Sequence, residues 1–144
     1  AVTTIGPSAF KGCIRLKSFV IPDGVISISG RAFNDCKNLT SVKIGCSVKS
    51  IGNNAFSGCE KLKGITIPYS VTTIGSSAFE RCSELKNVII SDSVLNIGDH
   101  AFSECEKLES VKLSKNITKI DNEMFYHCKK LKNVKFIVLA KIVS

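Results

Sequence analysis

The chain has 144 residues, of which 44% are hydrophobic and 22% are charged, and its formal net charge is +8 at neutral pH. This length suits one domain with a sizeable core, and this composition excludes an intrinsically disordered tail. No run of 18 apolar residues occurs, so the sequence predicts no membrane-spanning helix, and no basic and apolar leader opens it. We therefore expect residues 1–144 to form a single folded domain.

Six of the seven cysteines stand 23 residues apart, and the same period organises most other apolar positions. These six are Cys13, Cys36, Cys59, Cys82, Cys105 and Cys128. An alanine–phenylalanine pair precedes each cysteine, becoming Met124-Phe125 in the last repeat, and a leucine follows three positions later. Self-similarity at this period is typical of a solenoid, because one short repeat cannot bury its own apolar residues and stacked repeats bury them together.

Each repeat contains two kinds of apolar spacing. Residues 16–21 and their equivalents alternate in polarity after the leucine, which predicts a short strand with Phe19 and Ile21 pointing inward. After a loop, residues 28–36 and their equivalents place apolar side chains three to four positions apart, which predicts a turn of helix. Strands of successive repeats, about 4.8 Å apart, would then form a parallel sheet.

The repeat C-x-x-L-x-x-[VI]-x-I-P-x-x-V-x-x-I-G-x-x-A-F, in six tandem copies from Val2 to Phe136, resembles the BspA-like, treponemal-type leucine-rich repeat. Loops such as Ile21-Pro22-Asp23-Gly24 match this subtype. The resemblance implies an α/β solenoid, a right-handed curved coil with a parallel β-sheet on its concave face and short helical turns on its convex face. It also implies a cell-surface or secreted protein that takes part in adhesion or in binding host proteins.

The two ends of the sequence depart from the repeat. Residues 1–5 match the tail of an earlier repeat, and beyond Phe136 the polar loop becomes apolar. Because solenoids normally carry polar capping repeats, we expect a fragment of a longer array; a short protein whose apolar tail covers the last repeat is the alternative. An open edge in either case favours a homo-oligomer formed through a terminus.

Seven cysteines raise the question of disulfides or a metal site, and the repeat argues against both. Equivalent positions of adjacent repeats lie about 4.8 Å apart with parallel Cβ directions, whereas a disulfide needs facing Cβ atoms about 3.8 Å apart. No C-x-x-C pair occurs, and single cysteines in a row cannot surround zinc. We expect the six periodic cysteines to be buried, and Cys46, which stands in the loop, to be exposed and reactive.

Candidate catalytic residues are scarce. His100 and His127 fall in different columns of the repeat and are predicted to lie at the surface. The carboxylates are scattered, and no glycine-rich phosphate-binding loop is present. We therefore expect neither an enzyme nor a bound cofactor or metal.

Recognition residues are expected among the positions outside the apolar columns. On each strand, the residues on either side of the first inward side chain point outward. The predicted binding residues on this concave face are Ser41, Lys43, Thr66, Asn87, Ile89, Ser110, Lys112, Asn133 and Lys135. Their lysines would attract an acidic partner, but lysine on a sheet also discourages aggregation, so both roles are open.

A basic patch of Lys129, Lys130 and Lys132 lies near the C-terminus, where no acid follows Glu123. It could meet an anionic glycan, an acidic protein or a phosphate backbone. Nucleic-acid binding would add exposed aromatic rings or a reading helix, but all eight phenylalanines occupy core columns. Nucleic acid is therefore not favoured as a partner.

Three functions remain open on the sequence. The first is a non-enzymatic module that binds a protein or glycan, such as a host or matrix protein, through the concave face. The second is a structural spacer within a larger surface protein. The third is a polyanion binder that uses the basic patch.

Overall fold

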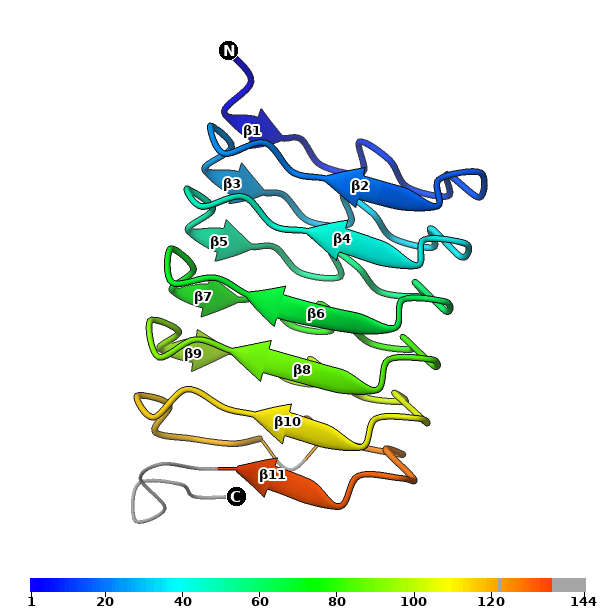
Figure 1. Ribbon diagram of the computed structural model, residues 1–144, viewed down its shortest axis with the longest axis vertical. Coiled ribbons are helices and arrows are strands. Elements are labelled where there is room, and N and C mark those ends of the chain that lie inside the picture. Colours follow the sequence, from blue (N-terminus) through cyan, green and yellow to red (C-terminus); the bar gives the residue numbers. More distant parts are fainter. Residues whose placement is uncertain (122, 136–144) are drawn as a thin grey trace.

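The structure, a computed structural model, describes residues 1–121 and 123–135 as a stack of parallel β-coils (Figure 1). The long strands are β2 (Ser18–Val20), β4 (Ser41–Lys43), β6 (Gly64–Ile67), β8 (Asn87–Ile90), β10 (Ser110–Lys112) and β11 (Asn133–Lys135). The short strands are β1 (Thr4–Ile5), β3 (Ser27–Ile28), β5 (Ser50–Ile51), β7 (Thr73–Ile74) and β9 (Asn96–Ile97). Long and short strands run in opposite directions along two sides of the stack (Figure 1).

Strand pairing follows the repeat without a slip. Every pairing is parallel and joins residues 23 positions apart, as in Ile65 with Val88. The short strands form one sheet in the order β1-β3-β5-β7-β9. The long strands form a sheet β11-β10-β8-β6 and a separate pair β2-β4, so the ladder is interrupted between β4 and β6. The parallel-strand solenoid predicted from the repeat is therefore confirmed.

The core consists of the periodic apolar columns. Strands β6 and β8 alternate exposed and buried side chains along all four positions, as the sequence pattern predicts. The rings of Phe33, Phe56, Phe79 and Phe102 are fully buried and stack with centroids 5.1–5.4 Å apart and interplanar angles of 2–3°. One phenylalanine per repeat thus builds a continuous aromatic stack, since each ring packs on its own copies above and below.

The helical turns predicted for the opposite side are wrong, and with them the α/β class: residues 1–121 and 123–135 contain no helix. These segments, residues 30–35 and their equivalents in the other repeats, are chains of tight turns, and we call the side of the stack that they form the turn side. In each of the first five such segments two residues have positive φ, for example Arg31 and Asp35, both at 58°. Left-handed residues four positions apart cannot belong to one right-handed helix. Consistently, nothing in the described chain has the length and apolarity of a membrane-spanning helix.

Backbone hydrogen bonding explains why turns replace the helix. In the second repeat, the N–H groups of Arg31, Phe33 and Asp35 donate to carbonyls of the next repeat at 2.7–2.9 Å. The intervening N–H groups donate to carbonyls three positions back, as Ala32 does to Ser29. A helix would use these donors internally. The alternating pattern instead connects neighbouring coils along the turn side as well as through the sheets.

Candidate binding surface

The outward side of the long strands, which we call the long-strand face, carries the predicted binding residues. Strand register aligns them in two rows, with Asn87 beside Ser110 and with Thr66, Ile89 and Lys112 in succession. Ser41, Lys43, Thr66, Asn87, Ile89 and Lys112 are exposed, and Ser110 is half-buried. Asn133 and Lys135 continue the rows in β11, but their side chains lie outside the described part of the structure.

An open hollow of about 440 Å³ lies on this face across β4, β6 and β8. Lys43, Thr66, Asn87 and Ile89 line it, so the structure brings four predicted residues together. Gly64 also lines the hollow, at a position where neighbouring repeats carry serine or asparagine. The absence of a side chain at this position opens the surface above β6.

Sequence reasoning missed the importance of Gly64, which it treated as one more small residue. A Cβ built on Gly64 would meet only the carbonyl oxygen of Asn87, at 3.6 Å, which is an ordinary contact. The backbone therefore does not require glycine at this position. A glycine in a column of larger polar residues was the signal that could have located the hollow.

A second, smaller hollow of about 120 Å³ adjoins the first on the side of β10 and shares Thr66, Pro68 and Ile89 with it. Lys112 and Tyr69 line only this second hollow. Ile89 is 49% exposed and Tyr69 78% exposed, so apolar surface stands open where the two hollows meet. Pro68 and Tyr69 were not among the predicted binding residues.

The charge on the long-strand face is positive. No outward residue of the described strands is acidic, while Lys43 and Lys112 point from β4 and β10. In the loops that follow the long strands, Asp23 Oδ1 accepts from Cys46 N at 3.2 Å, and Asp92 Oδ1, which belongs to a residue lining the second hollow, accepts from Lys115 N at 3.0 Å. Neither lysine forms an ion pair with any residue that the structure describes.

The predicted basic patch forms a separate surface at the last repeat. Lys129, Lys130 and Lys132 are exposed around an open space of about 410 Å³ that Glu109 also lines. Lys129 Nζ lies 4.0 Å from Glu106 Oε1, at the limit of an exposed ion pair. Such a pair contributes little binding energy, so the ammonium groups stay available to an anion.

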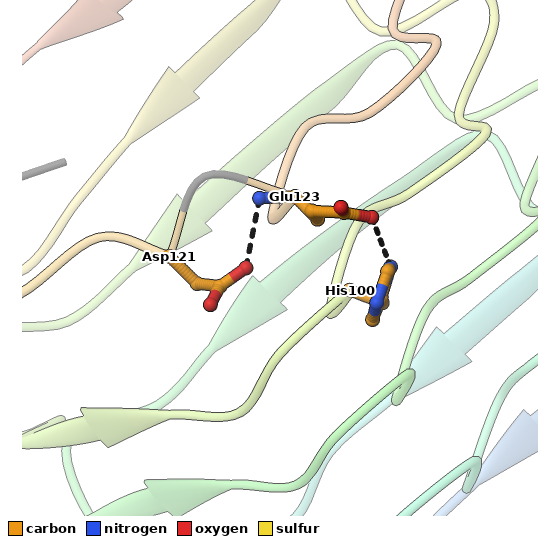
Figure 2. A network of polar contacts seen from close by, with 3 residues as sticks. All are labelled: His100, Asp121 and Glu123. Carbon is orange, nitrogen blue, oxygen red and sulfur yellow. Dashed lines mark hydrogen bonds and ion pairs between the residues drawn. The ribbon is translucent and has the colours of Figure 1, made fainter.

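His100, Asp121 and Glu123 make a small polar network beside the last turns (Figure 2). His100 Nδ1 lies 3.6 Å from Glu123 Oε2, and Glu123 N donates to Asp121 Oδ1 at 2.8 Å. The side chains of His100 and Glu123 are 41% and 55% exposed, and His127 is exposed, so the surface prediction for both histidines is confirmed. Across residues 1–121 and 123–135, no group of three or more histidine, cysteine or acidic residues could hold a metal ion.

The periodic cysteines are buried as predicted, fully in the middle repeats and partly at Cys13 and Cys128. The structure adds a role that the sequence did not indicate, because each thiol from Cys36 onward donates to a phenylalanine carbonyl of the preceding repeat. In Cys82 this contact is 3.2 Å, to the carbonyl of Phe56. Burial raises the pKa of Cys36 and of Cys128 to about 11 and raises the pKa of Cys59, Cys82 and Cys105 still further. Cys46 is exposed in its loop, as predicted.

The N-terminal end of the stack presents an apolar hollow of about 350 Å³ lined by Phe10, Phe19 and Val25 among others. Such a surface is compatible with the homo-oligomer expected through a terminus. That oligomer stays a prediction, since the structure contains one chain.

This chain is similar to several bacterial leucine-rich repeat proteins of solved structure. The T. pallidum Leucine Rich Repeat protein TpLRR is 30% identical with a TM-score of 0.93, over 96% of this chain and 64% of that one. A leucine-rich repeat protein from Bacteroides ovatus is 35% identical with a TM-score of 0.76, over 94% of this chain and 41% of that one. The pneumococcal vaccine antigen PcpA is 26% identical with a TM-score of 0.79, over 99% of this chain and 34% of that one.

The chain thus spans less than two thirds of each of these three proteins, at 64%, 41% and 34% of their lengths. No curated protein sequence matches it. Residues 2–139 match, in six copies, the family described as BspA type Leucine rich repeat region. This chain therefore belongs to the BspA-type leucine-rich repeat family.

Proposed function

We propose that this chain is a non-enzymatic binding module that presents its long-strand face to a protein or glycan partner at the cell surface or outside the cell. The observation that carries the proposal is the open hollow of about 440 Å³ on that face, lined by outward side chains that strand register holds in rows. A rigid strand scaffold supports recognition because little conformational entropy is lost when the partner binds. The extracellular setting is supported by the relative PcpA, which is described as a vaccine antigen.

Charge reversal on the face tests the binding role. The purified chain would be passed over an immobilised panel of extracellular-matrix proteins and glycans, beside the double variant Lys43→Glu/Lys112→Glu. We expect a partner whose binding this variant weakens by at least about tenfold, since rim charges steer and hold an oppositely charged surface. Lys49→Glu, on the exposed short-strand side, is the control with the same change of charge per site. A chain that binds nothing on the panel would favour the structural spacer.

A polyanion binder is the second candidate, because three exposed lysines surround one open space at the last repeat. Binding to heparin or DNA should then fall steeply with salt, since each neutralised charge releases a counterion. Changing Lys129, Lys130 and Lys132 to glutamine would abolish such binding, while Lys43→Glu/Lys112→Glu would leave most of it. The reverse result would assign the anion to the long-strand face instead.

A further inference from the structure

One of the two rows of outward side chains on the long-strand face has an order that suggests what it binds. From β4 to β10 it reads Lys43, Thr66, Ile89 and Lys112, one residue from each successive repeat. Two ammonium groups thus flank a polar and an apolar side chain. Ile89 lies where the two hollows adjoin, and Tyr69 stands exposed beside it.

Strand pairing determines how a ligand can lie on this row. Strand β8 is paired on both sides, with β6 and with β10, so a ligand cannot extend the sheet by backbone hydrogen bonds there. At β8, where the two hollows meet, a ligand must therefore cross the strands and meet their side chains. The four repeats stay stacked across the interruption between β4 and β6, with Phe rings 5.1–5.4 Å apart, so spacings of roughly 4.8–5.4 Å put Lys43 and Lys112 about 14–16 Å apart along that crossing direction.

An extended peptide matches this spacing. At about 3.4 Å per residue, side chains i and i+4 of a strand lie on one face about 14 Å apart, with side chain i+2 midway between them. Acids at i and i+4 would reach Lys43 and Lys112. The residue at i+2 would then stand over Thr66 and Ile89, where the two hollows meet.

We propose that the row Lys43–Thr66–Ile89–Lys112 binds an extended protein segment of the pattern acid-x-apolar-x-acid, which lies across β4, β6, β8 and β10. This rests on the proposed function and specifies its partner. Charge complementarity supports the acids, because the outward residues of the described strands include lysines and no acid, and the loop carboxylates of Asp23 and Asp92 already accept backbone N–H groups. The exposed Ile89 supports a peptide over a sulfated glycan, which has no apolar side chain to place there.

The test uses two fluorescein-labelled peptides of identical composition and fluorescence anisotropy with the purified 144-residue chain. The first contains Glu-Ser-Leu-Ser-Glu between glycines, and the second contains Glu-Ser-Ser-Leu-Glu, which keeps both acids and turns leucine to the opposite face. We expect the first peptide to bind at least about fivefold more tightly, because only its leucine faces the protein. Equal affinity for the two peptides, or no binding of either, would overturn the proposal.

Variants locate the peptide on the surface. Lys43→Glu and Lys112→Glu should each weaken the first peptide about tenfold, and Ile89→Ser should remove its preference over the second peptide. Gly64→Leu should fill the hollow and weaken binding, while Lys49→Glu, outside the face, should change affinity by less than about twofold. Thermal melts of each variant separate lost binding from lost folding. If Lys49→Glu weakened the peptide as much as Lys43→Glu does, binding would be a general charge effect and the proposed row would be wrong.

The outcome is separable from that of the proposed function. Suppose that the protein panel yields a partner blocked by Lys43→Glu/Lys112→Glu, but neither peptide binds. The long-strand face would then stand as a binding surface, and the acid-x-apolar-x-acid segment would be rejected. If a sulfated oligosaccharide displaced that partner from the chain, the ligand of this face would be a glycan, and the acid-x-apolar-x-acid segment would again be rejected.

Discussion

The turn side and the long-strand face of this solenoid come from the same repeats and differ in how strictly they repeat. On the turn side, phenylalanine and cysteine recur at 23-residue spacing, and neighbouring rings differ in orientation by as little as 2°. On the long-strand face, equivalent positions carry valine, lysine, threonine and isoleucine in turn. Strict repetition therefore marks where a side chain contacts its own copies, and variation marks where it contacts solvent.

The physical reason is that each residue of a buried column packs against the equivalent residue of the next repeat, about 5 Å away, so the same side chain must fit against its own copy. A phenylalanine ring can stack on another, and a cysteine thiol can donate to the carbonyl of the preceding repeat, as Cys59 does to Phe33 at 3.2 Å. An outward side chain has no such partner to satisfy. The long-strand face can consequently acquire a hollow at Gly64 or a lysine at Lys43 with no cost to the coils beneath.

Of the substitutions considered, truncation of a stacked phenylalanine ring should lower the stability of the fold most. Phe79→Ala removes a fully buried ring between Phe56 and Phe102, and we expect the free energy of unfolding to fall by about 3–5 kcal/mol. Ile89→Ala, on the exposed face, should cost less than about 1 kcal/mol because its side chain is half exposed already. Urea denaturation measures both. Similar losses in the two variants would contradict the distinction between column and face.

Two glycines give a closer comparison. A Cβ on Gly75 would lie 2.6 Å from the backbone nitrogen of Asn53 in the preceding repeat, whereas a Cβ on Gly64 meets nothing closer than 3.6 Å. We expect Gly75→Ala to destabilise the fold by about 1–3 kcal/mol, as overpacking does. Gly64→Ala should change stability by less than about 1 kcal/mol, because this position tolerates a side chain without strain. Thermal and urea unfolding of the Gly75→Ala and Gly64→Ala variants measure this difference. Equal losses of stability in the two variants would contradict it.

Replacement of the close-approach glycine has natural counterparts within the chain. In the repeat where Asp121 stands at the position equivalent to Gly75, residues 118–121 form no strand. The rings of Phe102 and Phe125 are also farther apart there, at 6.0 Å. Where Ser29 stands at this position, β3 still pairs with β1. Strand β1 is the edge of its sheet, so the first coil has room to move outward. A middle repeat such as that of Gly75 lacks this freedom.

Sequence periodicity predicted the solenoid, its parallel register and the buried columns, because these depend only on which residues recur. It did not predict the turns, since apolar residues three to four positions apart suit a helix and a chain of tight turns equally. Gly12 and Gly58 have positive φ, and glycine at this position of the repeat was the available sign of a left-handed turn residue. The sign was obscured because other repeats carry Asp35, Arg81 and Glu104 at the same position. Gly64 could have signalled where the hollow lies, but the size of the hollow was out of reach, because it depends on how far the surrounding side chains extend.

The smallest predicted effect concerns the buried thiols. Burial raises the pKa of Cys36 from its ordinary value of 9.0 to about 11, so the unfolded chain loses this proton at lower pH than the folded chain does. Stability from this thiol is complete below about pH 9 and falls by about 1 kcal/mol per pH unit above it, until the folded thiol ionises too. Urea denaturation at pH 8 and pH 10 should therefore show a smaller alkaline loss for Cys36→Ala than for the unmodified chain. Cys46→Ala, which removes the exposed cysteine, is the control for loss of a thiol outside the column. An unchanged alkaline loss in Cys36→Ala would mean that the cysteine column does not keep its thiols protonated, and the turn side would then be more open to solvent than its stacked rings indicate.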